Sequence, residues 1–207
     1  MLYKFIVKRY TKIKKEEFFM LGLWIALGVV AFLIISVILW WISTYNSLVK
    51  LRNNVKESFS TMDVYMQKRY DLIPNIVETI KGYAKHERGT FEDVVKARNA
   101  AFSAGTIEEK QKAEGQLSSA LKSLFALAEA YPDLKANTNF VTLQTQLQDI
   151  ELEISNSRRY YNACVKEYNN KIAMFPSSII AKKHNFEAEQ MFEVDSPDHR
   201  KNVKVEF

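Results

Sequence analysis

Several charged and amide side chains lie on or beside the apolar stripes of predicted helices, where they are the best candidates for chemistry. Arg158 takes a stripe position itself, between Ile154 and Tyr161. A buried charge needs a partner, because an isolated one costs several kcal/mol or changes its protonation. These side chains therefore either pair and fix the register of neighbouring helices, or form a ligand site between helices. The other candidates are Asp63, Arg69, Asp71, Pro74, Asn75, Glu129, Glu151, Asn162 and Asn169.

Arg158 carries the most specific of these predictions. Its place on the stripe indicates a partly desolvated guanidinium, which can bind a carboxylate through two parallel hydrogen bonds. We therefore predict that Arg158 pairs with an acid on another helix, with Asp63 and Glu129 as the best candidates.

The segment "QKRYDLIPN", residues 67–75, places a proline inside a helical pattern. Pro74 has no backbone N–H, so the carbonyl of Tyr70 loses its usual donor, and the proline ring crowds that carbonyl. We expect the helix to kink or restart there, with Arg69 or Asn75 satisfying the freed carbonyl. A structural bend is the favoured interpretation, and a partner-binding surface is the alternative.

Patterns typical of catalysis are missing from the sequence. The three histidines, His86, His184 and His199, are far apart, and "HERGT" lacks the second histidine of a zinc-protease helix. There is no Gly-rich phosphate loop and no serine in an elbow motif. Cys164 is the one cysteine, so no intramolecular disulfide forms, and its apolar helical face indicates a core residue. The sequence therefore predicts no catalytic residue, metal or cofactor.

Residues 18–42 form an uncharged apolar run of 25 residues. At ~1.5 Å per residue a helix of this length spans roughly 37 Å, more than the ~30 Å hydrocarbon core of a bilayer. The run is too long for a signal-peptide core, and no cleavage motif follows it. Trp40 and Trp41 stand at one end, where an interfacial aromatic belt would lie. We predict a single membrane-spanning helix.

The charge distribution predicts how this helix is oriented. Six basic residues and two acids precede residue 18, whereas the rest of the chain is nearly neutral. The positive-inside rule therefore favours a cytoplasmic N-terminus, an extracytoplasmic domain and, in a bacterium, the inner membrane. The neutral domain argues against nucleic acid as a partner. Gly22 and Ala26 are a weak indication of helix association within the membrane.

The span is predicted to continue directly into the first helix of the domain. No glycine or proline occurs between Gly28 and Pro74, and apolar residues recur every three or four positions. We therefore expect one helix from about Phe18 to at least Met66. The stripe is made by Leu48, Leu51, Val55, Phe59, Met62, Met66, Tyr70 and Ile73.

Three further helices follow in the pattern. The first covers roughly 91–104, with Thr90 as its expected cap. The second starts at a capping box of Thr106 and Glu109, and the third runs over 140–175 after a cap at Asn137 or Thr138. Long amphipathic helices with short connections predict an antiparallel bundle with coiled-coil-like packing.

The fold class is thus all-α: a transmembrane helix that continues into an antiparallel bundle, with an extended C-terminal tail. Pro176 ends the last long helix, one short turn follows, and "KNVKVEF" alternates like a strand. A lone strand needs support, so we expect the tail to lie on the bundle or pair with another chain. The boundaries are a basic tail at 1–17, the span at 18–42, the bundle at 43–176, and a short helix and extended strap at 177–207.

Long blocks of this sequence resemble the LemA family. They are "SLVKLRNNVKESFSTMDVYMQKRYDLIPNIVETIKGYAKHERGTFEDVVKARNAA", "LFALAEAYPDLKANTNFVTLQTQLQDIELEISNSRRYYNACVKEYNNKIAMFPSSIIA" and the ending "KVEF", within roughly residues 45–207. The resemblance implies a bacterial protein with an N-terminal span and a helical bundle. It implies no established activity.

Two interpretations of function stay open at this point. The first is a non-enzymatic, membrane-anchored scaffold or adaptor that assembles with itself or with other membrane proteins. The second is a ligand-sensing domain with a polar pocket between helices, lined by Arg158, Glu151 and Asn162. The nature of any small-molecule ligand does not follow from the sequence.

Overall fold

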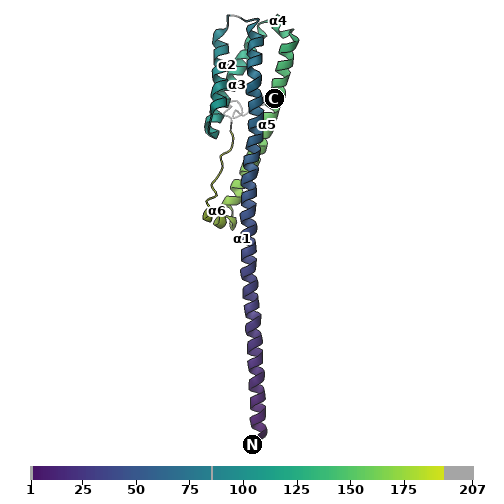
Figure 1. The fold of residues 1–207 in the computed structure, drawn as a ribbon, viewed down its shortest axis with the longest axis vertical. Helices are drawn as coiled ribbons and strands as arrows, with labels where there is room; N and C mark the ends of the chain where they lie inside the picture. The colour runs from purple at the N-terminus through teal and green to yellow at the C-terminus, as the bar shows by residue number, and fades with distance from the viewer. Residues whose placement is uncertain (1, 85, 194–207) are drawn as a thin grey trace, which may run out of the picture.

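The protein is all-α over the residues that its computed structural model describes, which are 2–84 and 86–193, with side chains from residue 17 onward. This confirms the predicted fold class, a long N-terminal helix joined to a helical bundle (Figure 1). The helices are α1 (Leu2–Lys81), α2 (Arg88–Ser103), α3 (Ile107–Glu129), α4 (Pro132–Lys135), α5 (Thr138–Ala173) and α6 (Ser177–Lys183).

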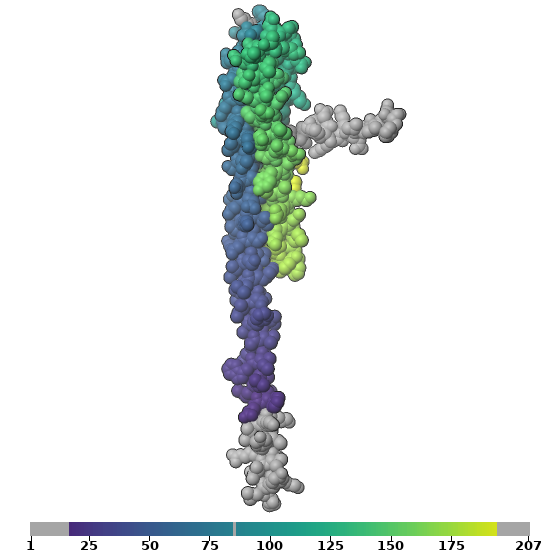
Figure 2. All heavy atoms as spheres, turned by 90° about the vertical axis from the view of Figure 1, so that its right-hand side faces the viewer, coloured from purple at the N-terminus to yellow at the C-terminus, as the bar shows by residue number. Residues whose placement is uncertain are grey.

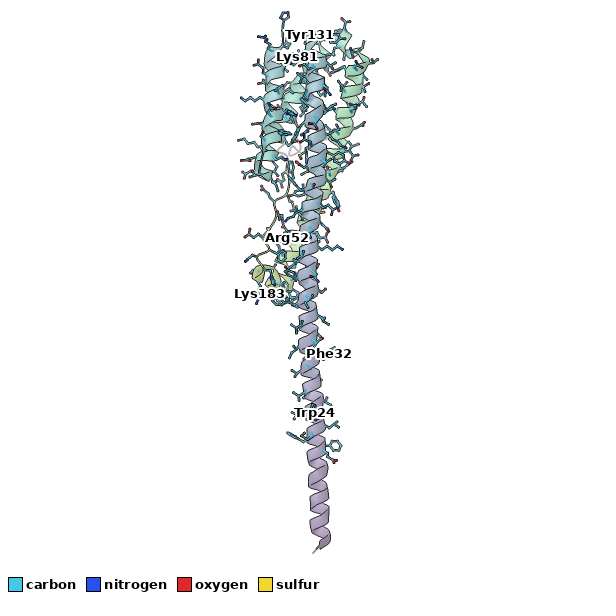
Figure 3. The ribbon with its side chains drawn as sticks, viewed as in Figure 1. Trp24, Phe32, Arg52, Lys81, Tyr131 and Lys183 are labelled. Carbon is cyan, nitrogen blue, oxygen red and sulfur yellow. The ribbon has the colours of Figure 1, made fainter. Side chains whose placement is uncertain are left out.

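Helix α1 carries the apolar run of residues 18–42 and is also the central element of the bundle. It runs for 80 residues without a break. This includes the stretch from Phe18 to Met66 that the absence of glycine and proline predicts to be one helix. From Phe18 to Ile42 nearly all its side chains are exposed, and Trp24 and Phe32 project from a part of α1 that no other helix covers (Figure 3). Of the residues described, α1 alone provides a helix that is long and apolar enough to cross a membrane.

The bundle forms around the second half of α1. Helix α5 runs antiparallel to α1 along most of its own length, and α2 and α3 form a hairpin beside them (Figures 1 and 2). The predicted stripes supply the core, because their 3-and-4 spacing places one face of each helix toward its neighbours. Buried stripe residues include Met62, Met66 and Ile73 of α1, Leu117 and Leu124 of α3, and Ile154 and Val165 of α5.

The helix starts show which capping predictions hold. Thr106 and Glu109 form the predicted reciprocal capping box, with the Thr106 hydroxyl accepting from the Glu109 N–H at 3.2 Å. Asn137 caps α5, accepting from the Phe140 N–H at 3.1 Å. The cap predicted at Thr90 is wrong, since α2 begins at Arg88 and Thr90 lies inside it. An aspartate at the third position makes a weaker box than a glutamate, which fits this result.

The chain turns back along the bundle after α6. Helix α6 lies against α1 near residues 41–45, and residues 186–193, which have no regular secondary structure, then run along α5 (Figure 1). We call residues 186–193 the strap. The segment 201–207, predicted to alternate like a strand, lies outside the described residues.

Candidate functional site: a buried polar network and the strap

Arg69 is the centre of a buried polar network that joins three helices. Its side chain is 1% exposed and pairs with two carboxylates, Glu114 of α3 and Glu151 of α5; the Nη1–Oε1 distance to Glu151 is 2.7 Å. Glu114 is also 1% exposed, and its second carboxylate oxygen accepts a hydrogen bond from the Tyr70 hydroxyl. We call Arg69, Tyr70, Glu114 and Glu151 the Arg69 network. It cross-links α1, α3 and α5 through groups that a bundle core does not normally bury.

Glu114 and the Tyr70 hydroxyl are the members of the Arg69 network that are absent from the predicted site residues, and Glu114 carries the charge. The signal was present, because Glu114 starts a stripe of strict 3-and-4 spacing that continues at Leu117, Leu121, Leu124 and Ala128. A carboxylate on that stripe has to be buried against the neighbouring helices. Ala113, the preceding residue, is buried too.

The proline inside α1 is accommodated by a side chain from another helix. Helix α1 continues through Pro74 to Lys81, so the helix does not restart. The freed carbonyl of Tyr70 accepts from Nε of Arg98 in α2 at 3.1 Å. The prediction that Arg69 or Asn75 satisfies this carbonyl is wrong, since Arg69 is engaged by two carboxylates and Asn75 is exposed. Pro74 thus creates an acceptor on α1 that attaches α2.

Replacing Arg98 with methionine is expected to cost about 1–3 kcal/mol of unfolding free energy, because the Tyr70 carbonyl then stays buried without a donor. In a Pro74→Ala background the same change should cost less, since the introduced alanine supplies the missing N–H. Urea unfolding in detergent measures the cost of Arg98→Met with Pro74 present and with Pro74→Ala. The control is Lys96→Met on the exposed face of α2. Equal costs of Arg98→Met in both backgrounds would show that the carbonyl is not the relevant partner.

Arg158 does not form the ion pair that its position predicted. Asp63 pairs instead with Lys110 of α3, and Glu129 is exposed at the far end of that helix. The guanidinium of Arg158 lies over the ring of Phe192 in the strap, 5.5 Å from the centroid. Burial and the nearby charge of Arg69 lower its pKa, and Glu151 opposes them. Helical periodicity correctly predicted that the Arg158 side chain points toward other elements of the protein. The element it meets is the strap, through Phe192, and not an acid on another helix.

Two asparagines on α5 hold the strap in place. The Asn162 side-chain amide binds both backbone groups of Phe192, donating to its carbonyl at 3.0 Å and accepting from its N–H at 2.8 Å. Asn169, seven residues on, binds Glu189 in the same way, at 2.8 and 3.0 Å. Seven helical residues rise about 10.5 Å, which matches three extended residues at ~3.3 Å each. The asparagines therefore act as an acceptor–donor ladder for extended chain.

Tyr70 and Tyr161 link the network and the strap to pH. Burial raises the pKa of Tyr70 to about 12, against a lowering effect of Arg69, and burial raises the pKa of Tyr161 to about 12. The Tyr161 hydroxyl donates to the Gln190 carbonyl of the strap at 2.7 Å. Both hydroxyls donate hydrogen bonds, so both have to stay protonated.

The free energy of unfolding is expected to fall as the pH rises from about 10 toward about 12. Unfolded tyrosines lose their protons near pH 10, so in this window the unfolded state binds fewer protons than the folded state and gains stability relative to it. Below about pH 10 both tyrosines are protonated in the folded and the unfolded state, so their full contribution to the free energy of unfolding is present there. Urea unfolding at about pH 9 and about pH 11 tests this, and Tyr70→Phe should reduce the difference between the two conditions. An unchanged difference would show that Tyr70 does not contribute.

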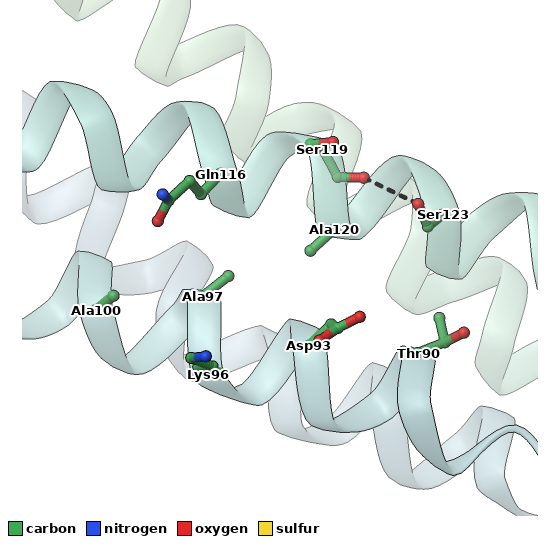
Figure 4. A pocket seen from close by; sticks show the side chains of 9 residues that line it. All are labelled: Thr90, Asp93, Lys96, Ala97, Ala100, Gln116, Ser119, Ala120 and Ser123. Atoms are coloured by element: carbon green, nitrogen blue, oxygen red, sulfur yellow. Dashed lines mark hydrogen bonds between the residues drawn. The ribbon is translucent and has the colours of Figure 1, made fainter.

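Among the hollows beside the α3 helix, two differ in the character of their lining. One, of about 570 Å³, lies between α2 and α3 and is lined by small and polar side chains, among them Ala97, Ala120 and Ser119 (Figure 4). The other is a more apolar groove of about 630 Å³ between α3 and α5, lined by Leu121, Phe125 and Leu147 among others. Glu151 of the Arg69 network is at the edge of this second groove.

The structure separates the predicted site residues into three groups. Arg69 and Glu151 meet in the buried network, while Asn162, Asn169 and Arg158 serve the strap. The remaining ones are not brought together into a site. Asp71, Pro74, Asn75 and Glu129 are exposed, and Asp63 pairs with Lys110.

Comparisons with known proteins give a family match and several relatives. The model of the LemA family matches residues 58–207. The magnetosome protein MamQ of Magnetospirillum gryphiswaldense is 25% identical in an alignment of 174 residues that covers 72% of this chain and 64% of that protein. Protein LemA of Metamycoplasma hominis is 24% identical over 171 residues, which are 82% of this chain and 74% of that protein. The chain therefore spans just under two thirds of the length of MamQ. Because the family model covers most of its residues, the chain belongs to the LemA family.

Proposed function

We propose that this protein is a membrane-anchored helical scaffold or adaptor, which assembles with itself or with other membrane proteins. The observation that carries the proposal is α1. One helix runs from an exposed apolar stretch at residues 18–42 to the far tip of the bundle at Lys81. A rigid rod of this kind holds the far tip of the bundle at a fixed distance from a bilayer; the 39 residues from Ile42 to Lys81 rise about 58 Å.

The placement of the polar residues supports a structural role. Arg69 and its two carboxylates pair with each other, and the asparagines of α5 bind the strap. Polar groups engaged in this way fix helix register and hold elements together, which is the best-attested use of buried polar residues. They do not form the pocket of Arg158, Glu151 and Asn162 that the ligand-sensing interpretation required, because Phe192 of the strap lies on Arg158 and is bound by Asn162.

The proposed surface for assembly is on the solvent side of α1 and α5. Val64, Leu152 and Tyr160 are apolar or aromatic residues of these two helices with 52%, 59% and 61% of their surface exposed. A photo-crosslinking amino acid at Leu152, in native bacterial membranes, is expected to give discrete adducts that mass spectrometry can identify. The same amino acid at the exposed Glu92 of α2 is the matched control. A protein that yields no adduct from either position would contradict a scaffold.

The orientation is part of the proposal. The basic residues before the span favour a cytoplasmic N-terminus and an extracytoplasmic bundle. A cysteine introduced at the exposed Thr106, in a Cys164→Ala background, should react with an impermeant reagent on intact cells once any outer membrane is permeabilised. Labelling only after the inner membrane is opened would reverse the orientation while leaving the anchor in place.

The groove between α3 and α5 favours a second candidate function, the sensing of a small apolar ligand. Its volume of about 630 Å³ and its apolar lining of Leu121, Phe125 and Leu147 fit the general properties of ligand pockets. Ala126 is exposed at the groove, so Ala126→Trp should block it with little effect on folding. Small molecules that copurify with the native chain should then be lost, whereas Ala100→Trp on α2 should retain them. Identical extracts from all three proteins would contradict this function.

A further inference from the structure

The base of the bundle exposes apolar side chains at the turn between α5 and α6 and on α6 itself. Met174, Phe175 and Ile179 have 62%, 80% and 50% of their surface exposed. Phe175 is more exposed than any large apolar residue of the span itself. Three such residues within six positions are unusual for a surface that faces only water, and grouped exposed apolar residues indicate a contact with a partner or a membrane.

These residues lie where the membrane-spanning stretch of α1 ends. Helix α6 packs on α1 at Trp41, next to Ile42, the last residue of the apolar run. The Lys183 ammonium is 5.7 Å from the Trp41 ring centroid, and the ring centroids of His184 and Tyr45 are 4.8 Å apart. Figures 1 and 3 show α6 and Lys183 beside α1 at the lower end of the bundle. If residues 18–42 cross the bilayer, the base lies at the level of the lipid headgroups.

The charges around the base fit an anionic lipid surface. Lys182 and Lys183, both exposed, end α6 and flank the apolar residues. Lysines bury their alkyl stems at an interface and keep the ammonium at the level of the lipid phosphates. Exposed aromatic and aliphatic residues beside lysines are also the composition of segments that lie in the plane of a membrane surface.

We propose that the base, meaning residues 174–176 together with α6, is a second membrane contact that binds anionic phospholipid. Met174, Phe175 and Ile179 enter the interface, and Lys182 and Lys183 bind lipid phosphates. The inference rests on the proposed function, because only an α1 that crosses the membrane brings the base to the bilayer surface. One helix alone allows the bundle to rotate and tilt. A second contact on the side of α6 restricts both motions, so that the bundle presents a defined face to its partners.

The test uses the full chain in vesicles of phosphatidylcholine with phosphatidylglycerol. A nitroxide on Met174→Cys, in a Cys164→Ala background, reports its depth through its accessibility to oxygen and to a water-soluble nickel complex. We expect an interfacial depth at position 174, a deeper one for Leu33→Cys in the span, and full exposure to water for Val141→Cys at the far end of α5. A deep position 33 with position 174 in water would overturn the inference and leave the proposed anchor intact. A position 33 in water would overturn both.

The lysines give the second measurement. With Lys182→Gln and Lys183→Gln, the ratio of docked to undocked base should fall about fivefold per lysine removed on anionic vesicles. On vesicles of phosphatidylcholine alone, the same changes should have no effect. Lys96→Gln with Lys112→Gln, both exposed on α2 and α3, is the control of equal charge. An equal loss with the control pair, or an effect that does not depend on phosphatidylglycerol, would overturn lipid-phosphate binding at the base.

Discussion

Arg69→Met is expected to lower the free energy of unfolding by about 3–5 kcal/mol, the usual cost of breaking a buried ion pair from one side. The reason is Glu114, which is 1% exposed and would retain only the Tyr70 hydroxyl as a partner. Glu151 would lose its partner too, but its side chain is 41% exposed and water can replace the guanidinium. The cost therefore arises mainly from leaving the Glu114 carboxylate buried without its cation. Urea unfolding in detergent measures this loss of unfolding free energy.

A double-mutant cycle separates the pair from the packing of its side chains. Arg69→Met combined with Glu114→Leu should cost clearly less than the sum of the two single changes, since no unpaired charge stays buried. The control is Lys81→Met, which removes an exposed pair with Glu78 and should cost about 0–1 kcal/mol. Additive costs in the cycle would mean that the two residues contribute independently. A cost for Arg69→Met no larger than that for Lys81→Met would contradict the buried network.

The composition of this network shows what periodicity can predict. Spacing indicated that Arg69 and Glu151 lie beside buried stripes, and they do. It could not identify the partner helix, because the side-chain direction on one helix is local whereas the partner depends on how the helices are arranged. Arg158 illustrates the difference. Its direction toward other elements was correct, yet the strap, not an acid, covers it.

The fold was more predictable than the site because its signals are local. The unbroken course of α1 between Gly28 and Pro74 follows from the lack of glycine and proline in that stretch, and the α3 start follows from the Thr106 capping box. Pro74 is the instructive exception. The sequence showed that a carbonyl is freed, but its donor, Arg98, lies 28 residues away on another helix. Tertiary contacts of this kind carry no short-range signal in one sequence.

The docking of the strap was partly predictable, less so than the helices and more so than the partners in the Arg69 network. The spacing of seven between Asn162 and Asn169 was visible, and both were noted as polar residues near a stripe. What the pattern did not show is that two side-chain amides at this spacing match every third residue of an extended chain. In this bundle the pair of asparagines seven apart near an apolar stripe is the trace that the docked strap leaves in the sequence.

Phe192→Ala is expected to remove about 3–5 kcal/mol of stability from the docked strap, the usual cost of truncating a buried phenylalanine. The ring is 1% exposed and lies under the Arg158 guanidinium, while Asn162 holds the backbone on both sides. The strap attaches through a few side chains: asparagines of α5, Gln111 of α3, and Arg52 and Tyr45 of α1, which contact Phe186. Because these contacts are few, the loss should appear as local detachment of the segment around Phe192. Amide exchange at Phe192 and Glu189 should accelerate about hundredfold or more, since each 1.4 kcal/mol is a factor of ten.

The same experiment distinguishes a detachable strap from one that is part of the core. Protection of the α1 and α5 amides should stay unchanged in Phe192→Ala, and Phe175→Ala, at an 80% exposed position, should alter the strap by less than ~0.5 kcal/mol. A uniform loss of protection across the bundle would mean that the strap unfolds only together with α1 and α5. An unaffected strap would mean that the asparagine ladder alone holds it, and Asn162→Ala would then have to release Phe192. In the expected case the strap is an independently detachable element, and its release uncovers Arg158 and the amide of Asn162.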